Sequence, residues 1–142
     1  MINASVLLAP VFVEVALTFG LLLWAGYLRL VAVRSGEVHP RDVSLRQLNW
    51  PHQALKLTNA YQNQLELPGL FYAVIILTLT QLAPIPLTMA VLAWVFVVLR
   101  LVHALIHVTT NDLTRRFFVF LAGAGVLMLM WLIFFVRIVF GA

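Results

Sequence analysis

Four long apolar segments, separated by polar or proline-containing connections, constrain the fold of this chain more than any other feature. They run over about residues 6–33, 54–82, 86–108 and 117–139. Each is at least as long as the roughly 20 apolar residues that a helix needs to cross a bilayer. Only 10% of the 142 residues are charged, too few to cover a soluble surface. We therefore predict an all-α integral membrane protein that forms a single four-transmembrane-helix bundle.

The basic residues of the connections predict the orientation of this bundle. The segment from 34 to 53 carries Arg34, Arg41 and Arg46, and the link before the fourth helix carries Arg115 and Arg116. These two connections lie on the same side of a four-span bundle, whereas the opposite connection and the N-terminal tail are uncharged. Because basic loops stay in the cytoplasm, we expect both termini on the outer side. We expect the membrane to be the cell inner membrane.

Several function classes are disfavoured by what the sequence lacks. The chain has no cysteine, and its net charge of +4 is scattered instead of forming a basic patch, so we expect no nucleic-acid partner. Phosphate loops, zinc-protease motifs and serine elbows are missing. His103 and His107 have the i, i+4 spacing of metal ligands. Since no carboxylate or thiolate lies near them in sequence, we interpret them as hydrogen-bonding histidines and expect no metal.

Two stripes of polar residues interrupt the apolar segments at helical spacing. The second segment carries Lys56, Asn59, Asn63 and Glu66 on one face, with Gln62 beside them. The third segment carries Arg100, His103 and His107. Unpaired polar groups are too costly to face lipid. Both stripes should therefore face other helices or a wet cavity.

A depth estimate suggests that the two stripes meet. Glu66 lies about 18 Å and Arg100 about 12 Å from the cytoplasmic ends of their helices, so we expect them to be in contact, directly or through a ligand. A packing network and a polar-ligand site both fit this pattern. Pro68 predicts a kink near Glu66. Glu14 lies about 12 Å from the outer side, in the opposite half of the membrane, and we interpret it as a helix-packing or subunit-contact residue.

The motifs on these stripes resemble those of a known family. The sequence NQLELP over residues 63–68, followed by RLVH over 100–103, is similar to the MAPEG family, the membrane-associated proteins in eicosanoid and glutathione metabolism. The resemblance extends over nearly the whole chain, through the order and spacing of the motifs and spans. It implies a homotrimer of four-helix subunits, with glutathione between neighbouring subunits on the cytoplasmic side.

The resemblance also implies which residues form the site. Arg116 matches the arginine that stabilises the glutathione thiolate, and is the expected catalytic residue. The expected glutathione-binding residues are Asn59, Asn63, Glu66, Arg100, His103 and His107. Glutathione carries two carboxylates, an ammonium group and a thiol; arginines suit the carboxylates, a glutamate suits the ammonium group, and a nearby cation favours the thiolate.

Departures from the family pattern keep two functions open. Asn59 and Gln62 stand where active members usually carry arginines, His107 stands at a tyrosine position, and residues 117–120 offer no hydroxyl. The first function is a glutathione-dependent membrane transferase or peroxidase acting on apolar electrophiles or lipid peroxides. The second is a non-catalytic protein of the same fold, an accessory subunit of a larger membrane complex or a lipid-binding module. Glutathione binding distinguishes the two.

Overall fold

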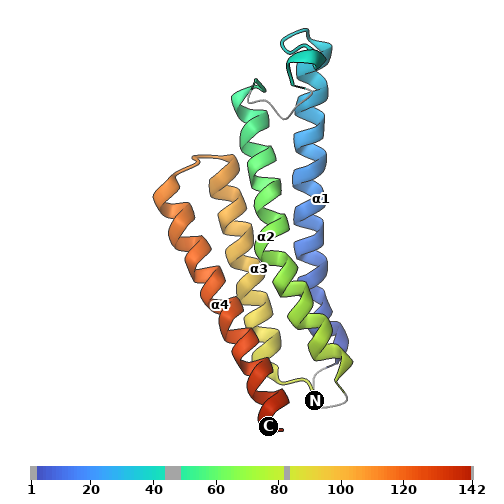
Figure 1. The fold of residues 1–142 in the computed structure, drawn as a ribbon, viewed down its shortest axis with the longest axis vertical. Coiled ribbons are helices and arrows are strands. Elements are labelled where there is room, and N and C mark those ends of the chain that lie inside the picture. Colours follow the sequence, from blue (N-terminus) through green and yellow to red (C-terminus); the bar gives the residue numbers. More distant parts are fainter. Residues whose placement is uncertain (1–2, 44–48, 82–83, 142) are drawn as a thin grey trace.

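Four long helices make up the structure, which is a computed structural model (Figure 1). The helices are α1 (Ala4–Arg34), α2 (His52–Thr80), α3 (Leu87–Val108) and α4 (Leu113–Phe140). The residues that the structure describes are 3–43, 49–81 and 84–141. Each of the four helices is long and apolar enough to cross a membrane. The predicted all-α, four-helix integral membrane fold is confirmed, whereas the side of the membrane that the termini face stays a prediction.

The helix boundaries differ most from the expected spans at the start of α4. Asp112 caps this helix, because its side chain accepts a hydrogen bond of 3.0 Å from the backbone N–H of Arg115. The helix therefore begins at Leu113 and includes Arg115 and Arg116 in its first turn, where the hydropathy pattern had suggested a start at about residue 117. Between α1 and α2 the described residues form one 3₁₀ turn, η1 (Pro40–Asp42). Arg46 lies outside the described residues.

The four helices run alternately up and down. In Figure 1 both termini lie at one end, and the connections from α1 to α2 and from α3 to α4 lie at the other. α1 packs on α2 and α3, and α4 packs on α3 and α2. Pro68 is buried near the middle of α2, and Figure 1 shows this helix changing direction about halfway along its length. A proline has no N–H to donate to the carbonyl four residues earlier, so the carbonyl of Gln64 loses its helical partner.

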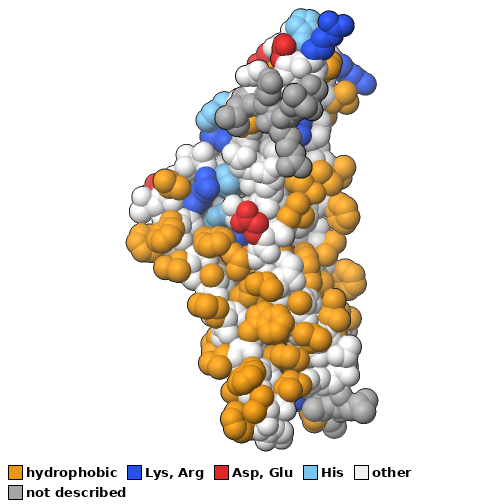
Figure 2. Space-filling view, in the orientation of Figure 1, with side chains coloured by type: hydrophobic (Ala, Val, Ile, Leu, Met, Phe, Trp, Pro, Cys, Tyr) orange, Lys and Arg blue, Asp and Glu red, His pale blue; other side chains and the backbone are white. Residues whose placement is uncertain are grey.

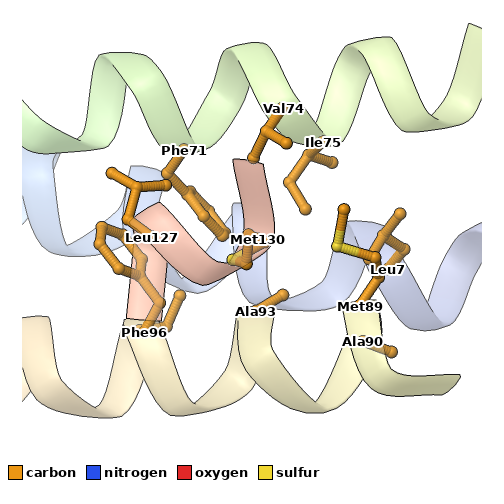
Figure 3. Packing of buried hydrophobic residues seen from close by; sticks show 11 residues of the cluster. Leu7, Phe71, Val74, Ile75, Met89, Ala90, Ala93, Phe96, Leu127 and Met130 are labelled. Carbon is orange, nitrogen blue, oxygen red and sulfur yellow. The ribbon is translucent and has the colours of Figure 1, made fainter. Parts of the chain in front are cut away.

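Two clusters of buried hydrophobic side chains form the core. In the cluster nearer the termini, the rings of Phe71 and Phe96 stack with centroids 4.6 Å apart (Figure 3). Its members are Leu7, Phe71, Val74, Ile75, Met89, Ala90, Ala93, Phe96, Val97, Leu127 and Met130. The cluster nearer the connections comprises Leu21, Ala25, Leu57, Ala60 and Ala104. Between these two clusters, each of α1, α2 and α3 buries at least one polar side chain.

Candidate functional site

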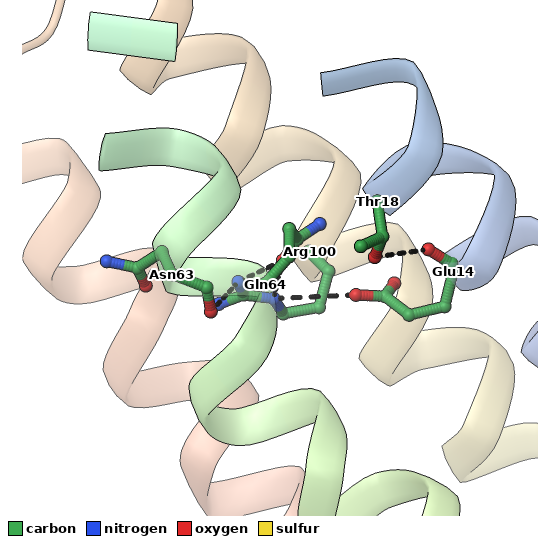
Figure 4. A network of polar contacts seen from close by, with 5 residues as sticks. All are labelled: Glu14, Thr18, Asn63, Gln64 and Arg100. Atoms are coloured by element: carbon green, nitrogen blue, oxygen red, sulfur yellow. Dashed lines mark hydrogen bonds and ion pairs between the residues drawn. The ribbon is translucent and has the colours of Figure 1, made fainter. Parts of the chain in front are cut away.

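A buried polar cluster of Glu14, Gln64 and Arg100 lies between the two hydrophobic clusters (Figure 4). The three residues are 0%, 2% and 2% exposed. Nε of Arg100 donates to Oε1 of Gln64 at 2.9 Å and lies 3.8 Å from Oε1 of Glu14. Nη2 donates to the same Gln64 oxygen and, at 2.9 Å, to the backbone carbonyl of Asn63. Arg100 on α3 thus connects α1 to α2.

Two expectations about these charges are wrong, namely a direct contact between Arg100 and Glu66 and a place for Glu14 in the opposite half of the membrane. A contact between Arg100 and Glu66 through a ligand stays a prediction. Arg100 pairs with Glu14 instead of forming a direct contact with Glu66, which is exposed and forms no hydrogen bond or ion pair with any described residue. Glu14 does not lie in the opposite half of the bundle. It stands about 15 Å from the start of α1, and Arg100 about 20 Å from the start of α3. The two starting points lie at the same end, so the difference is about one helical turn, which long side chains can span.

A cleft of about 210 Å³ opens between α2, α3 and α4. Its lining residues are Asn63, Glu66, His103, Leu113, Arg116, Phe117 and Phe120. Figure 2 shows acidic, basic and histidine side chains gathered on one face of the half that carries the connections, with hydrophobic side chains over most of the other half. The cleft therefore combines charged groups with an apolar rim.

The polar groups of the cleft retain free hydrogen-bonding capacity. Nη1 of Arg116 donates to Oδ1 of Asn111 at 2.5 Å, while its Nε has no partner among the described residues. Oδ1 of Asn63 is also unpartnered within the described part of the chain. The ring of His103 lies 6.1 Å from that of Phe120. A carboxylate, a guanidinium, an amide and an imidazole thus line the cleft beside two phenylalanines.

The cleft brings together only part of the expected site. Its lining includes four of the expected residues: Asn63, Glu66, His103 and Arg116. Arg100 points away into the buried polar cluster, where its charge is already paired. Asn59 is exposed on α2, and His107 is buried next to His103, with ring centroids 5.8 Å apart. Arg100, Asn59 and His107 therefore do not line the cleft.

Gln64 belongs to the buried polar cluster but not to the candidate site residues predicted from the sequence. Its signal was present, because Gln64 follows Leu57 and Ala60 at the seven- and four-residue spacings of one helix face, and both are buried. Asn59, Gln62 and Glu66 are instead exposed. On α2, the Gln64 amide is therefore buried inside the bundle, whereas Asn59, Gln62 and Glu66 of the polar stripe form an outward row.

Comparisons with known proteins give one result. The family model described as MAPEG family matches residues 7–136, nearly the whole chain. No curated protein and no solved structure gave a significant match. Among residues 3–43, 49–81 and 84–141, no group of three histidine, cysteine, aspartate or glutamate side chains is arranged to hold a metal ion.

Proposed function

Because the chain belongs to the MAPEG family, we propose that it is a glutathione-dependent membrane transferase or peroxidase acting on apolar electrophiles or lipid peroxides. The observation that carries this proposal is the cleft between α2, α3 and α4. Glu66, Arg116 and His103 line it together with two phenylalanines. A peptide thiol from water and an apolar substrate from lipid can therefore meet at one place.

Each polar group of the cleft suits one part of glutathione. Glu66 complements the ammonium group, and Asn63 offers an amide to the peptide backbone. Arg116 is the group we assign to the thiol, because a cation close to sulfur stabilises the thiolate, which is the nucleophile. In the transferase reaction, the thiol loses its proton to solvent and the thiolate sulfur bonds to the electrophilic carbon of the substrate. The substrate either expels its leaving group as an anion or, where sulfur adds to a double bond or epoxide, takes up a proton from solvent. Phe117 and Phe120 supply the apolar contact for that substrate.

We propose that the working form is a homotrimer. Asn59, Gln62 and Glu66 are exposed on α2 within a membrane-spanning helix. Hydrocarbon does not satisfy such groups, so another protein surface has to cover them. A second copy of the chain is the simplest cover, and it is the one that the family resemblance implies.

A second candidate function is favoured by the chemistry that the cleft lacks. Residues 117–120 offer no hydroxyl to assist the thiolate, and Arg100 is paired with Glu14 instead of facing the cleft. Both observations favour a non-catalytic accessory or lipid-binding protein of the same fold. Glutathione binding separates the two candidates.

The experiment is calorimetric titration of glutathione into the purified protein in detergent, up to millimolar concentration. We expect binding by the wild type and weaker binding by Glu66→Gln. The matched control is Glu37→Gln, which neutralises an exposed carboxylate in the connection between α1 and α2 and should leave binding unchanged. If a well-folded oligomer binds no glutathione at millimolar concentration, the enzyme proposal fails and the accessory function remains.

A further inference from the structure

The buried polar cluster lies directly behind one wall of the cleft. Arg100 donates to the backbone carbonyl of Asn63 at 2.9 Å, and the side chain of that same Asn63 lines the cleft. Figure 4 shows Arg100 reaching the α2 backbone here, with Glu14 approaching from α1 on the other side. The guanidinium therefore touches the cleft wall without entering the cleft.

This part of α2 needs support from outside the helix. Pro68 cannot donate to the carbonyl of Gln64, so the turn from Asn63 to Pro68 lacks one of its own hydrogen bonds. Arg100 bonds to the Gln64 side chain and the Asn63 carbonyl in that same turn. These bonds connect α3 to the α2 turn that carries Asn63 and Glu66.

Glu14 holds the guanidinium in this position. Its carboxylate is fully buried, and no hydrogen-bond donor reaches either oxygen from the described residues, so its role is the charge that it places beside Arg100. Replacing a buried ion pair by apolar residues of similar volume is often neutral or stabilising. Stability alone is therefore a weak reason for placing a carboxylate and a guanidinium in the middle of a membrane bundle.

We propose that Glu14 and Arg100 are positioning residues for the cleft. They fix the α2 turn that presents Asn63 and Glu66, and they act through Gln64 and the Asn63 carbonyl without touching the ligand. The effect on glutathione rests on the proposed function, whereas the effect on the α2 turn does not. A measurement of the mobility of this α2 turn can therefore separate the positioning role from the proposed enzyme function.

Nitroxide labels on α2 measure the turn directly. The chain has no cysteine, so Leu65→Cys and Ile76→Cys each give a single labelling site. Leu65 lies within the turn and Ile76 beyond Pro68, and both are 58% exposed, which makes them a matched pair. Each label is placed in the wild type and in the double variant Glu14→Met with Arg100→Met, which removes both charges at similar volume and leaves none unpaired.

We expect the double variant to fold and its label at position 65 to become more mobile, while the label at position 76 stays unchanged. Glutathione affinity should fall roughly tenfold, as is typical when supporting residues behind a binding site are lost. Unchanged mobility at position 65 in a folded double variant would overturn the positioning role, whatever glutathione does. Equal loosening at both positions would also overturn it, by indicating a general packing role.

Two further outcomes keep the proposals apart. If the double variant does not fold, Gln64→Leu removes the side-chain bond to Arg100 and leaves the ion pair with Glu14 in place. For the positioning role to stand, the label at position 65 must then become more mobile in Gln64→Leu than in the wild type. If position 65 loosens as expected but the wild type binds no glutathione, the positioning role stands and the enzyme proposal fails. If the wild type binds glutathione but the label at position 65 is no more mobile in the variant, the enzyme proposal stands and the positioning role fails.

Discussion

Arg100 shows how a single charged residue is accommodated in the middle of a membrane bundle. Hydrocarbon offers no hydrogen-bond acceptor, so a buried guanidinium has to find partners within the protein. Gln64, the Asn63 carbonyl and Glu14 supply them from two other helices. The residue therefore connects both α1 and α2 to α3.

The first prediction concerns the ion pair of Arg100. Glu14→Gln leaves a buried guanidinium without its counter-charge, which typically costs about 3–5 kcal/mol. Unfolding in detergent should show this loss, and adding Arg100→Met to Glu14→Gln should recover part of it. Glu66→Gln is the control, because Glu66 is exposed and unpaired among the described residues. Equal losses in Glu14→Gln and Glu66→Gln would contradict the pairing in the structure.

The second prediction concerns the reaction that we propose. Arg116→Ala should lower the rate of glutathione conjugation by about tenfold or more while weakening glutathione binding less, because a cation beside sulfur favours the thiolate. Arg115→Ala is the matched control: Arg115 is the neighbouring cation, pairs with Asp112 at 3.5 Å and lies outside the cleft lining. Steady-state kinetics and calorimetry together make the comparison. Equal effects of the two substitutions would indicate that both arginines merely anchor the helix end.

For the helices, hydropathy is sufficient to predict the four spans, because lipid selects apolar residues over about 20 positions. It failed where a polar residue belongs to the helix, as at the capped start of α4. Contacts between helices were harder to predict. Depth along a helix is known only to about a turn, and the rotation of each helix depends on its neighbours. For that reason Glu66 was expected beside Arg100, where Glu14 lies, and Gln64 was overlooked.

The third prediction concerns packing between helices. Phe96 of α3 is fully buried and stacks on Phe71 of α2. Phe96→Ala removes this contact and leaves a cavity, which typically costs about 3–5 kcal/mol. Phe135→Ala on α4 is the matched control, since Phe135 is 58% exposed and lipid can fill the space. Chemical unfolding in detergent measures both, and similar losses would argue against the stack as the centre of the core.

In the assembled bundle, most of the charges lie towards one end. Most of the basic residues lie in the connections at this end or in the helix turns beside them, and we expect this end in the cytoplasm. The absence of native cysteine makes the fourth prediction simple to test. Thr110→Cys, in the connection between α3 and α4, should be protected from an impermeant thiol reagent in intact cells, whereas Asn3→Cys should react. Reaction at Thr110→Cys with protection at Asn3→Cys would reverse the proposed orientation.

The fifth prediction concerns the surface that one subunit leaves uncovered. Asn59, Gln62 and Glu66 form an outward row on α2, and lipid cannot satisfy them. Because the family resemblance implies a trimer, we expect native mass spectrometry in mild detergent to give three times the 16.0 kDa mass of one chain. Gln62→Trp should weaken this assembly, because a bulky ring does not fit a packed polar contact, whereas Leu132→Trp, at an exposed apolar position of α4 away from that row, should not. A monomer that retains glutathione binding would show that the cleft is complete within one subunit. A partner other than a second copy would then have to cover the row on α2.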